Sequence, residues 1–118
     1  MTPRESYVSR NARNIKQLRE KLEKFTKELL MHPGHTMEWA DSAFATAAKL
    51  DLATDIRTNL EAGVTLQRIH EYLQERVMNH ARYINNYSTS SSANHMKHCQ
   101  LAAMVDELEV VNGLMKHE

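Results

Sequence analysis

Histidine is the first residue type in this sequence that suggests chemistry, because seven copies occur in a short chain. They lie at positions 32, 35, 70, 80, 95, 98 and 117. His95 and His98 are three residues apart, so on a helix they share one face, and this spacing can chelate Zn²⁺ or Ni²⁺. The single cysteine, Cys99, has no CxxC partner that would complete a structural zinc site. We therefore expect these histidines to be solvated or to cap helix ends, with no bound metal.

The sequence signatures of common enzyme sites are absent. The three glycines stand alone, so there is no glycine-rich phosphate loop. Neither an HExxH pair nor the Glu-x-x-His motif of di-iron bundles occurs. No Ser, Thr or Cys lies in a recognisable nucleophile setting. These observations predict a non-enzymatic protein with no catalytic residues and no cofactor.

Basic side chains are concentrated near the start of the chain, although the whole chain is formally neutral. Residues 1–19 carry five basic side chains against one acidic one, so the remainder is acidic by the same margin. This division favours charge pairing inside the protein, between subunits or with a protein partner. The predicted partner-binding residues are the five basic ones and one aromatic anchor: Arg4, Arg10, Arg13, Lys16, Arg19 and Trp39.

Four helices are predicted from capping residues and apolar periodicity. Thr2, Pro3 and Glu5 are typical of a capping box at a helix start, and the segment 32–35 contains the Pro-Gly pair that ends the same helix. Gly63 is the expected C-cap of the second helix, and Thr65 the N-cap of the third. The predicted helices are about 3–31, 36–62, 65–87 and 93–116, with 88–92 as a flexible Ser/Thr loop.

The first of these helices carries apolar residues at seven-residue spacing, which is typical of a coiled-coil seam with Asn11 as its polar member. The predicted oligomer seam consists of Val8, Ile15, Leu18, Leu22, Phe25 and Leu29. Three methionines elsewhere are expected to fill irregular core space: Met78, Met96 and Met104.

Length and composition limit the architecture to one small domain. The chain has 118 residues, of which 24 are Leu, Ile, Val or Phe, so a single chain builds only a thin core and is expected to associate. One cysteine cannot form an intrachain disulfide, which indicates a reducing compartment. No apolar stretch approaches the ~20 residues that cross a bilayer. We expect a cytoplasmic protein that does not enter a membrane.

The sequence thus predicts a single all-α domain, either an antiparallel up-down-up-down four-helix bundle or an oligomer of helical hairpins. The predicted function is that of a small interaction or regulatory protein, of the accessory or inhibitor type, that binds a protein partner and forms a homo-oligomer.

Two other functions remain as alternatives. The basic first helix can neutralise phosphates while Tyr7 stacks on a base, which would make the chain a nucleic-acid-binding protein. In an antiparallel bundle the first and third connections share one pole, so a metal or small ligand could bind a histidine-rich cluster there. That cluster would consist of His32, His35, His80, His95, His98 and Cys99.

Overall fold

The computed structural model describes residues 2–32, 34, 36–86 and 92–116, with the side chains of 36–39, 84–86 and 92–94 left undescribed. These residues form four α-helices and no strand. The helices are α1 (Pro3–Met31), α2 (Thr36–Glu61), α3 (Leu66–Asn86) and α4 (Ser92–Met115). The predicted all-α class is confirmed, and each helix boundary lies within one residue of its predicted position. Of the predicted loop, residues 88–91 lie outside the described residues, and Ser92 opens α4.

The predicted caps are present at the starts of α1 and α3. The Thr2 hydroxyl oxygen accepts a hydrogen bond from the Glu5 backbone N–H at 3.1 Å, and Pro3 occupies the first helical position. Thr65 accepts from the Arg68 backbone N–H at 3.3 Å in the same way. Both caps satisfy amide groups that have no carbonyl partner in the first turn of a helix.

Helix α2 ends in a Schellman motif built on Gly63. The N–H of Val64 donates to the Asn59 carbonyl at 3.0 Å, and the N–H of Gly63 donates to the Leu60 carbonyl at 3.1 Å. This geometry requires a left-handed residue, and Gly63 has a φ of 84°. The turn sends the chain directly into α3.

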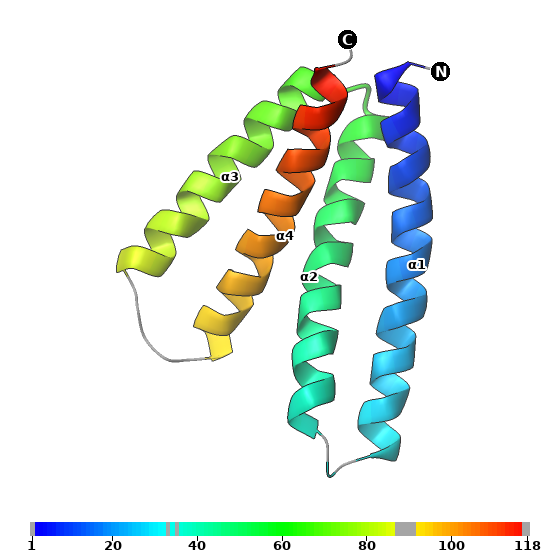
Figure 1. Cartoon of the computed structure of the whole chain (residues 1–118), viewed down its shortest axis with the longest axis vertical. Coiled ribbons are helices and arrows are strands. Elements are labelled where there is room, and N and C mark those ends of the chain that lie inside the picture. Colours follow the sequence, from blue (N-terminus) through cyan, green and yellow to red (C-terminus); the bar gives the residue numbers. More distant parts are fainter. Residues whose placement is uncertain (1, 33, 35, 87–91, 117–118) are drawn as a thin grey trace.

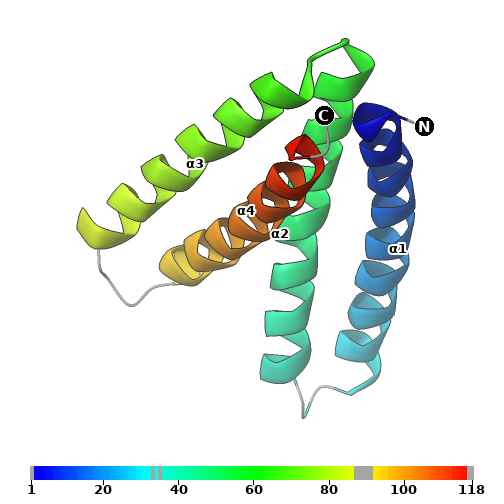
Figure 2. The ribbon, with the colours of Figure 1, turned by 45° about the horizontal axis from the view of Figure 1, so that its top comes forward.

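The helices form two hairpins, α1/α2 and α3/α4, that are joined chiefly where α2 packs on α4 (Figure 1). Successive helices run in opposite directions, and both chain ends lie at the same end of the molecule. The hairpins diverge away from that end, as the tilted view also shows (Figure 2). The backbone of α3 touches α1 and α2 only marginally, so the four helices do not close into a ring of equal neighbours.

All four helices meet in one apolar core at the end that carries the chain termini. Each contributes one side chain with no exposed surface: Tyr7, Ile56, Leu73 and Val111, at 0 % exposure each. The other buried members of this four-helix core are Leu52, Leu60, Leu66, Ile69, Ala103 and Met104. Burial of these side chains supplies the main driving force that holds the two hairpins together.

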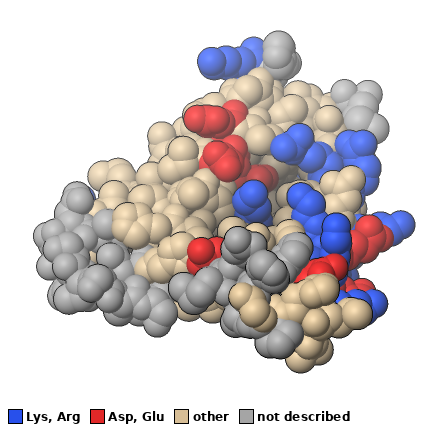
Figure 3. Space-filling view, turned by 60° about the horizontal axis from the view of Figure 1, so that its bottom comes forward, with Lys and Arg blue, Asp and Glu red and all other residues tan. Residues whose placement is uncertain are grey.

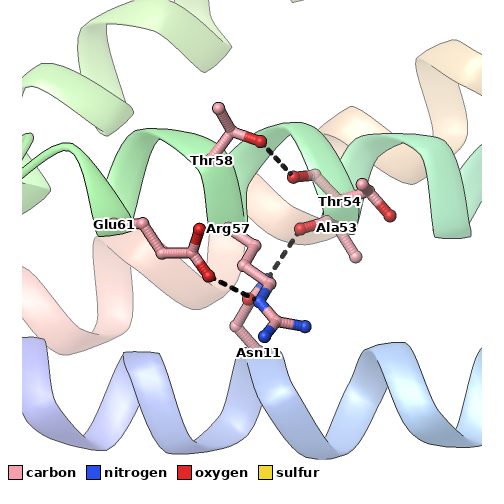
Figure 4. A network of polar contacts seen from close by, with 6 residues as sticks. All are labelled: Asn11, Ala53, Thr54, Arg57, Thr58 and Glu61. Carbon is pink, nitrogen blue, oxygen red and sulfur yellow. Dashed lines mark hydrogen bonds and ion pairs between the residues drawn. The ribbon is translucent and has the colours of Figure 1, made fainter.

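A second, smaller cluster holds α1 against α2 further from the termini. Ile15 and Leu18 are buried there against Ala53, with Leu50 packed on the cluster. Between the two clusters, the buried Asn11 side-chain amide donates to the Ala53 carbonyl at 3.0 Å (Figure 4). A buried amide that loses its acceptor costs about 1 to 3 kcal/mol, so this bond fixes the register of α1 on α2.

Tyr7 ties α1 to α4 inside the core. Its hydroxyl donates to the Glu107 carboxylate at 2.5 Å. Burial raises the pKa of the Tyr7 phenol far above its ordinary value, and the adjacent Glu107 carboxylate raises it further. The folded protein therefore retains the phenol proton under alkaline conditions in which the unfolded chain releases it.

This proton makes stability depend on pH in a defined direction. The contribution of the Tyr7 phenol to the free energy of unfolding is complete below the unfolded pKa of 10.0. It declines as the pH rises above this value, because the unfolded state then binds fewer protons than the folded state. We expect Tyr7→Phe to lower the free energy of unfolding by about 1 kcal/mol at pH 7. Between pH 10 and 11, wild type should lose about 1 kcal/mol more than the variant. Urea unfolding followed by circular dichroism measures the free energy of unfolding at each pH. If this free energy declined equally in wild type and variant between pH 10 and 11, the role of the Tyr7 proton would be contradicted.

Candidate functional site

Arg4, the first of the predicted partner-binding residues, is used inside the chain. Its guanidinium group donates to the Leu60 carbonyl at 2.9 Å and to the Val64 carbonyl at 3.3 Å. The Leu60 carbonyl lies in the last turn of α2, where it also accepts from the Gly63 N–H, and the Val64 carbonyl lies in the turn that follows. Arg4 therefore caps α2 and joins the start of α1 to its end.

The other four basic residues of the predicted patch are exposed but do not share one face. They are Arg10, Arg13, Lys16 and Arg19. Each of them follows the previous one by three residues. Three residues of an α-helix rotate by about 300°, which is roughly 60° less than a full turn. Three such steps make half a turn, so Arg10 and Arg19 lie on opposite sides of α1. Accordingly, Arg10 and Arg13 border one shallow hollow and Arg19 borders another.

Acidic residues of α4 lie beside the basic stretch. Arg10 shares a hollow of about 160 Å³ with Lys49 of α2 and with Asp106 and Glu107 of α4. Figure 3 shows Lys and Arg side chains close to Asp and Glu side chains on the face that it presents. Carboxylates this close weaken the stretch as a surface for a phosphate backbone, because they repel the same anions that the arginines attract.

The residues of the predicted seam divide into two groups. Ile15 and Leu18 are buried against α2 of the same chain, so they are not available to a second subunit while this hairpin is closed. The other four retain exposed surface: Val8, Leu22, Phe25 and Leu29. The connection after α1 holds α2 at a high effective concentration, which favours the intramolecular pairing. Association of the chain stays a prediction.

Trp39, the predicted aromatic anchor, lies in the first turn of α2. Its side chain falls outside the described residues. Its role as an anchor for a partner stays a prediction.

Three described histidines of the predicted cluster have a polar partner. His32 lies 3.3 Å from Glu28, and His95 lies 3.3 Å from Asp41. His80 is buried and contacts the Arg76 carbonyl and the Gln100 side-chain amide, both at 3.1 Å. Among the residues that the structure describes, no three His, Cys, Asp or Glu side chains are arranged to hold a metal ion. His35 and His117 lie outside the described residues.

Cys99, His95 and Asp41 lie in a row but lack the geometry of a nucleophile relay. The Cys99 sulfur is 3.8 Å from His95 Nε2, and the Asp41 carboxylate contacts the same nitrogen. A relay needs the thiol on one ring nitrogen and the carboxylate on the other, so that the base is oriented while it takes the proton. With both contacts on Nε2, this row provides a polar contact between α2 and α4 rather than an activated thiol.

A polar hollow of about 280 Å³ lies where α2, α3 and α4 begin to diverge. Its lining residues are Ala48, Asp51, Leu52 and Asp55 from α2, Arg76 from α3, and Gln100 and Met104 from α4. We call this hollow and its continuation along the three helices the α2–α3 groove. Helix α2 forms one wall, α3 forms the other, and α4 forms the floor.

Hydrogen bonds hold the closed end of the groove in one arrangement. The Tyr72 hydroxyl donates to the Asp55 carboxylate and bridges the two walls. Burial raises the pKa of the Tyr72 phenol, and the bond to Asp55 raises it further. On α3, the His80 ring contacts the Arg76 carbonyl through Nδ1 and Oε1 of Gln100 through Nε2. Both oxygens are acceptors, so a neutral ring donates its one N–H to one of them. These contacts fix the side chains that border the hollow.

Two opposite charges border the hollow without pairing. Asp51 is exposed on the α2 wall and makes no ion pair or hydrogen bond with any described residue. Arg76, on the α3 wall, lies over the Tyr72 ring with its guanidinium carbon 5.6 Å from the ring centre, and it forms no ion pair within the described chain. The groove thus presents an anion on one wall and a cation on the other.

Large apolar side chains are exposed where the groove opens. Phe44 is 43 % exposed and precedes Ala48 by one turn of α2, while Met96 is 46 % exposed and precedes Gln100 by one turn of α4. Residues four apart share a helix face, so we expect both side chains to lie on the flanks that lead away from the hollow. The prediction that Met78 and Met96 fill the core is wrong, because these side chains are 55 % and 46 % exposed and lie beyond the end at which all four helices meet. Met104, at 3 % exposure, is a core residue.

Sequence reasoning missed this groove because its residues come from three helices. One signal was present: Phe44, Ala48, Asp51 and Asp55 recur at helical spacing on α2. This stripe mixes an aromatic ring with carboxylates, which is unusual for a face that packs on its own chain. Its counterparts on α3 and α4 could be recognised only once the helix order was known.

Comparison of the chain with protein-family models, curated proteins and solved structures gave no match. Across the residues that the structure describes, none of the helices has both the length and the apolar character that a bilayer crossing requires.

Removal of the Arg4 side chain tests whether it acts as an internal cap. A charge-assisted hydrogen bond that is partly exposed contributes about 1 to 2 kcal/mol, so Arg4→Ala should lower the free energy of unfolding by that amount. Arg13→Ala on the same helix is the matched control and should change it by less than about 0.5 kcal/mol. Urea denaturation gives both values. Equal effects of the two substitutions would show that Arg4 is not a structural residue.

Proposed function

We propose that this chain is a non-enzymatic interaction protein that binds another protein through the α2–α3 groove. The observation that carries the proposal is the combination of exposed apolar side chains, Phe44 and Met96, with the charges of Asp51 and Arg76, which form no ion pair with a described residue. Protein interfaces have this composition, in which an apolar centre supplies most of the affinity and a polar rim sets orientation.

The groups at the closed end of the groove favour binding over catalysis. The raised pKa of Tyr72 keeps its phenol protonated, and its hydrogen bond to Asp55 occupies that carboxylate. Both nitrogens of His80 are engaged by Arg76 and Gln100. A hydrogen-bonded site of this kind is suited to hold a partner in one geometry.

Photo-crosslinking tests the groove as a docking surface. A photoreactive phenylalanine analogue at position 44 should capture one discrete protein in the cells that produce the chain. The same analogue at Lys24, on the exposed side of α1, should not capture it. Equal capture at both positions, or none at position 44, would contradict the proposal.

A matched pair of substitutions then tests the contact with the captured protein, purified separately. Met96→Asp should weaken its binding at least about tenfold, because a charge would enter the apolar centre of the interface. Met78→Asp makes the same change at another exposed methionine and should leave the affinity unchanged, because Met78 is two residues after Arg76 and therefore on nearly the opposite side of α3. Isothermal titration gives both affinities, and equal losses would place the contact elsewhere.

Self-association is the second part of the proposal. Leu30 and Met31, consecutive at the end of α1, are 81 % and 73 % exposed, and exposed apolar pairs of this size favour contact with another subunit. Light scattering at micromolar concentration should give a mass above the 13.6 kDa of one chain. Leu30→Glu should restore the monomer mass, and the charge reversal Lys21→Glu should not. A wild-type mass of one chain would contradict association.

A further inference from the structure

We infer that the segment bound in the α2–α3 groove is a single amphipathic α-helix with a basic edge and an acidic edge on either side of an apolar stripe. This inference rests on the proposed function and specifies its partner. Three features support it: the vacant position between α2 and α3, the length of the groove wall, and the charges on the two walls.

The order of the helices leaves a position for one more. Helix α1 packs on α2, and α3 packs on α4, while the backbones of α2 and α3 make only marginal contact. In a closed four-helix arrangement each helix has two close neighbours, which bury its apolar stripe from both sides. The flanks of α2 and α3 that face each other across α4 therefore offer the surface that a further helix would cover.

The α2 wall has the length and spacing that a short helix requires. Phe44, Ala48, Asp51 and Asp55 follow one another on one face of α2. This stretch is roughly 16 Å long at the α-helical rise, which corresponds to about three helical turns. Apolar residues at helical spacing on an occupant would meet Phe44 and Ala48 on the wall and Met96 on the floor.

Charge separates the two walls. The α2 wall carries Asp51, whose carboxylate has no described partner, and Asp55 one turn further on. The α3 wall carries Arg76 over the Tyr72 ring, and on the α4 floor Lys97 lies 5.1 Å from the centre of the Tyr83 ring of α3. A bound helix is accordingly complementary when its basic edge lies along α2 and its acidic edge lies along α3.

This arrangement also fixes the direction of the bound helix. When the apolar stripe faces the floor of the groove, exchanging the two edges requires the helix to run in the opposite direction. The charges of Asp51 and Arg76 therefore select both the partner and its polarity, while the apolar contacts supply affinity.

Three synthetic peptides test the inference. Each is a helix-stabilised segment of about four turns with the same apolar stripe, because shorter unmodified peptides do not hold a helix in water. The flanking edges are Lys and Glu in the first peptide, Lys and Lys in the second, and Glu and Glu in the third. Fluorescence anisotropy at low salt, where rim charges are least screened, should show that the Lys/Glu peptide binds about fivefold tighter than either other one.

Charge-reversal variants of the full chain should change this ranking in a defined way. Asp51→Lys makes both walls basic, so the Glu/Glu peptide should become the tightest binder. Arg76→Glu replaces the cation of the α3 wall by a carboxylate. The Lys/Lys peptide should then become the tightest binder. Glu75→Lys on α3 makes the same change as Asp51→Lys at a residue outside the hollow, and should leave the wild-type ranking intact. Circular dichroism confirms that each variant is folded.

The outcomes separate this inference from the proposed function. A wild-type preference that switches in both variants supports the two-edged helix. A ranking that stays the same in both variants, or no binding of any peptide, overturns it. If position 44 nevertheless captures a partner whose affinity falls in Met96→Asp, the groove remains the docking surface and its occupant is not such a helix. If that capture also fails, the proposed function is wrong as well.

Discussion

The convergence of four helices at one end only is the constraint on which the rest of the structure depends. Tyr7, Ile56, Leu73 and Val111 each lose all exposure there. A chain with 24 large aliphatic and phenylalanine residues cannot extend such a core along helices of 21 to 29 residues. The two hairpins therefore separate beyond the core, and the α2–α3 groove is the surface that this separation leaves uncovered.

Polar contacts fix the register of this small core. Arg4 joins the start of α1 to the end of α2, Asn11 binds the α2 backbone in mid-helix, and Tyr7 binds Glu107 of α4. On the exposed side of α2, Arg57 pairs with Glu61 and Thr58 binds the Thr54 carbonyl, as Figure 4 shows. Apolar packing alone tolerates sliding by a turn, whereas buried polar groups that lose their partners are costly. These contacts consequently hold α1 in one register against α2 and α4.

The helices could be predicted from the sequence because their limits depend on local chemistry. The Thr2 and Thr65 caps and the left-handed Gly63 act within a few residues of themselves. The site could not be predicted in the same way. Arg4 was expected to bind a partner, but its contacts are about 60 residues away, and the position of Arg76 relative to Asp51 depends on which helices are neighbours. Seven-residue periodicity identified the apolar face of α1, but it does not indicate whether a seam joins two helices of one chain or of two.

The most direct test of the central claim is an NMR titration of the ¹⁵N-labelled chain with the Lys/Glu helical peptide, which is practical for a protein of 13.6 kDa. The account predicts that the amide resonances that shift belong to residues 44–55 of α2, 72–83 of α3 and 96–104 of α4, while those of the exposed side of α1 stay in place. Shifts centred on Arg13 and Lys16, or spread evenly over the chain, would contradict the assignment of the groove as the docking surface.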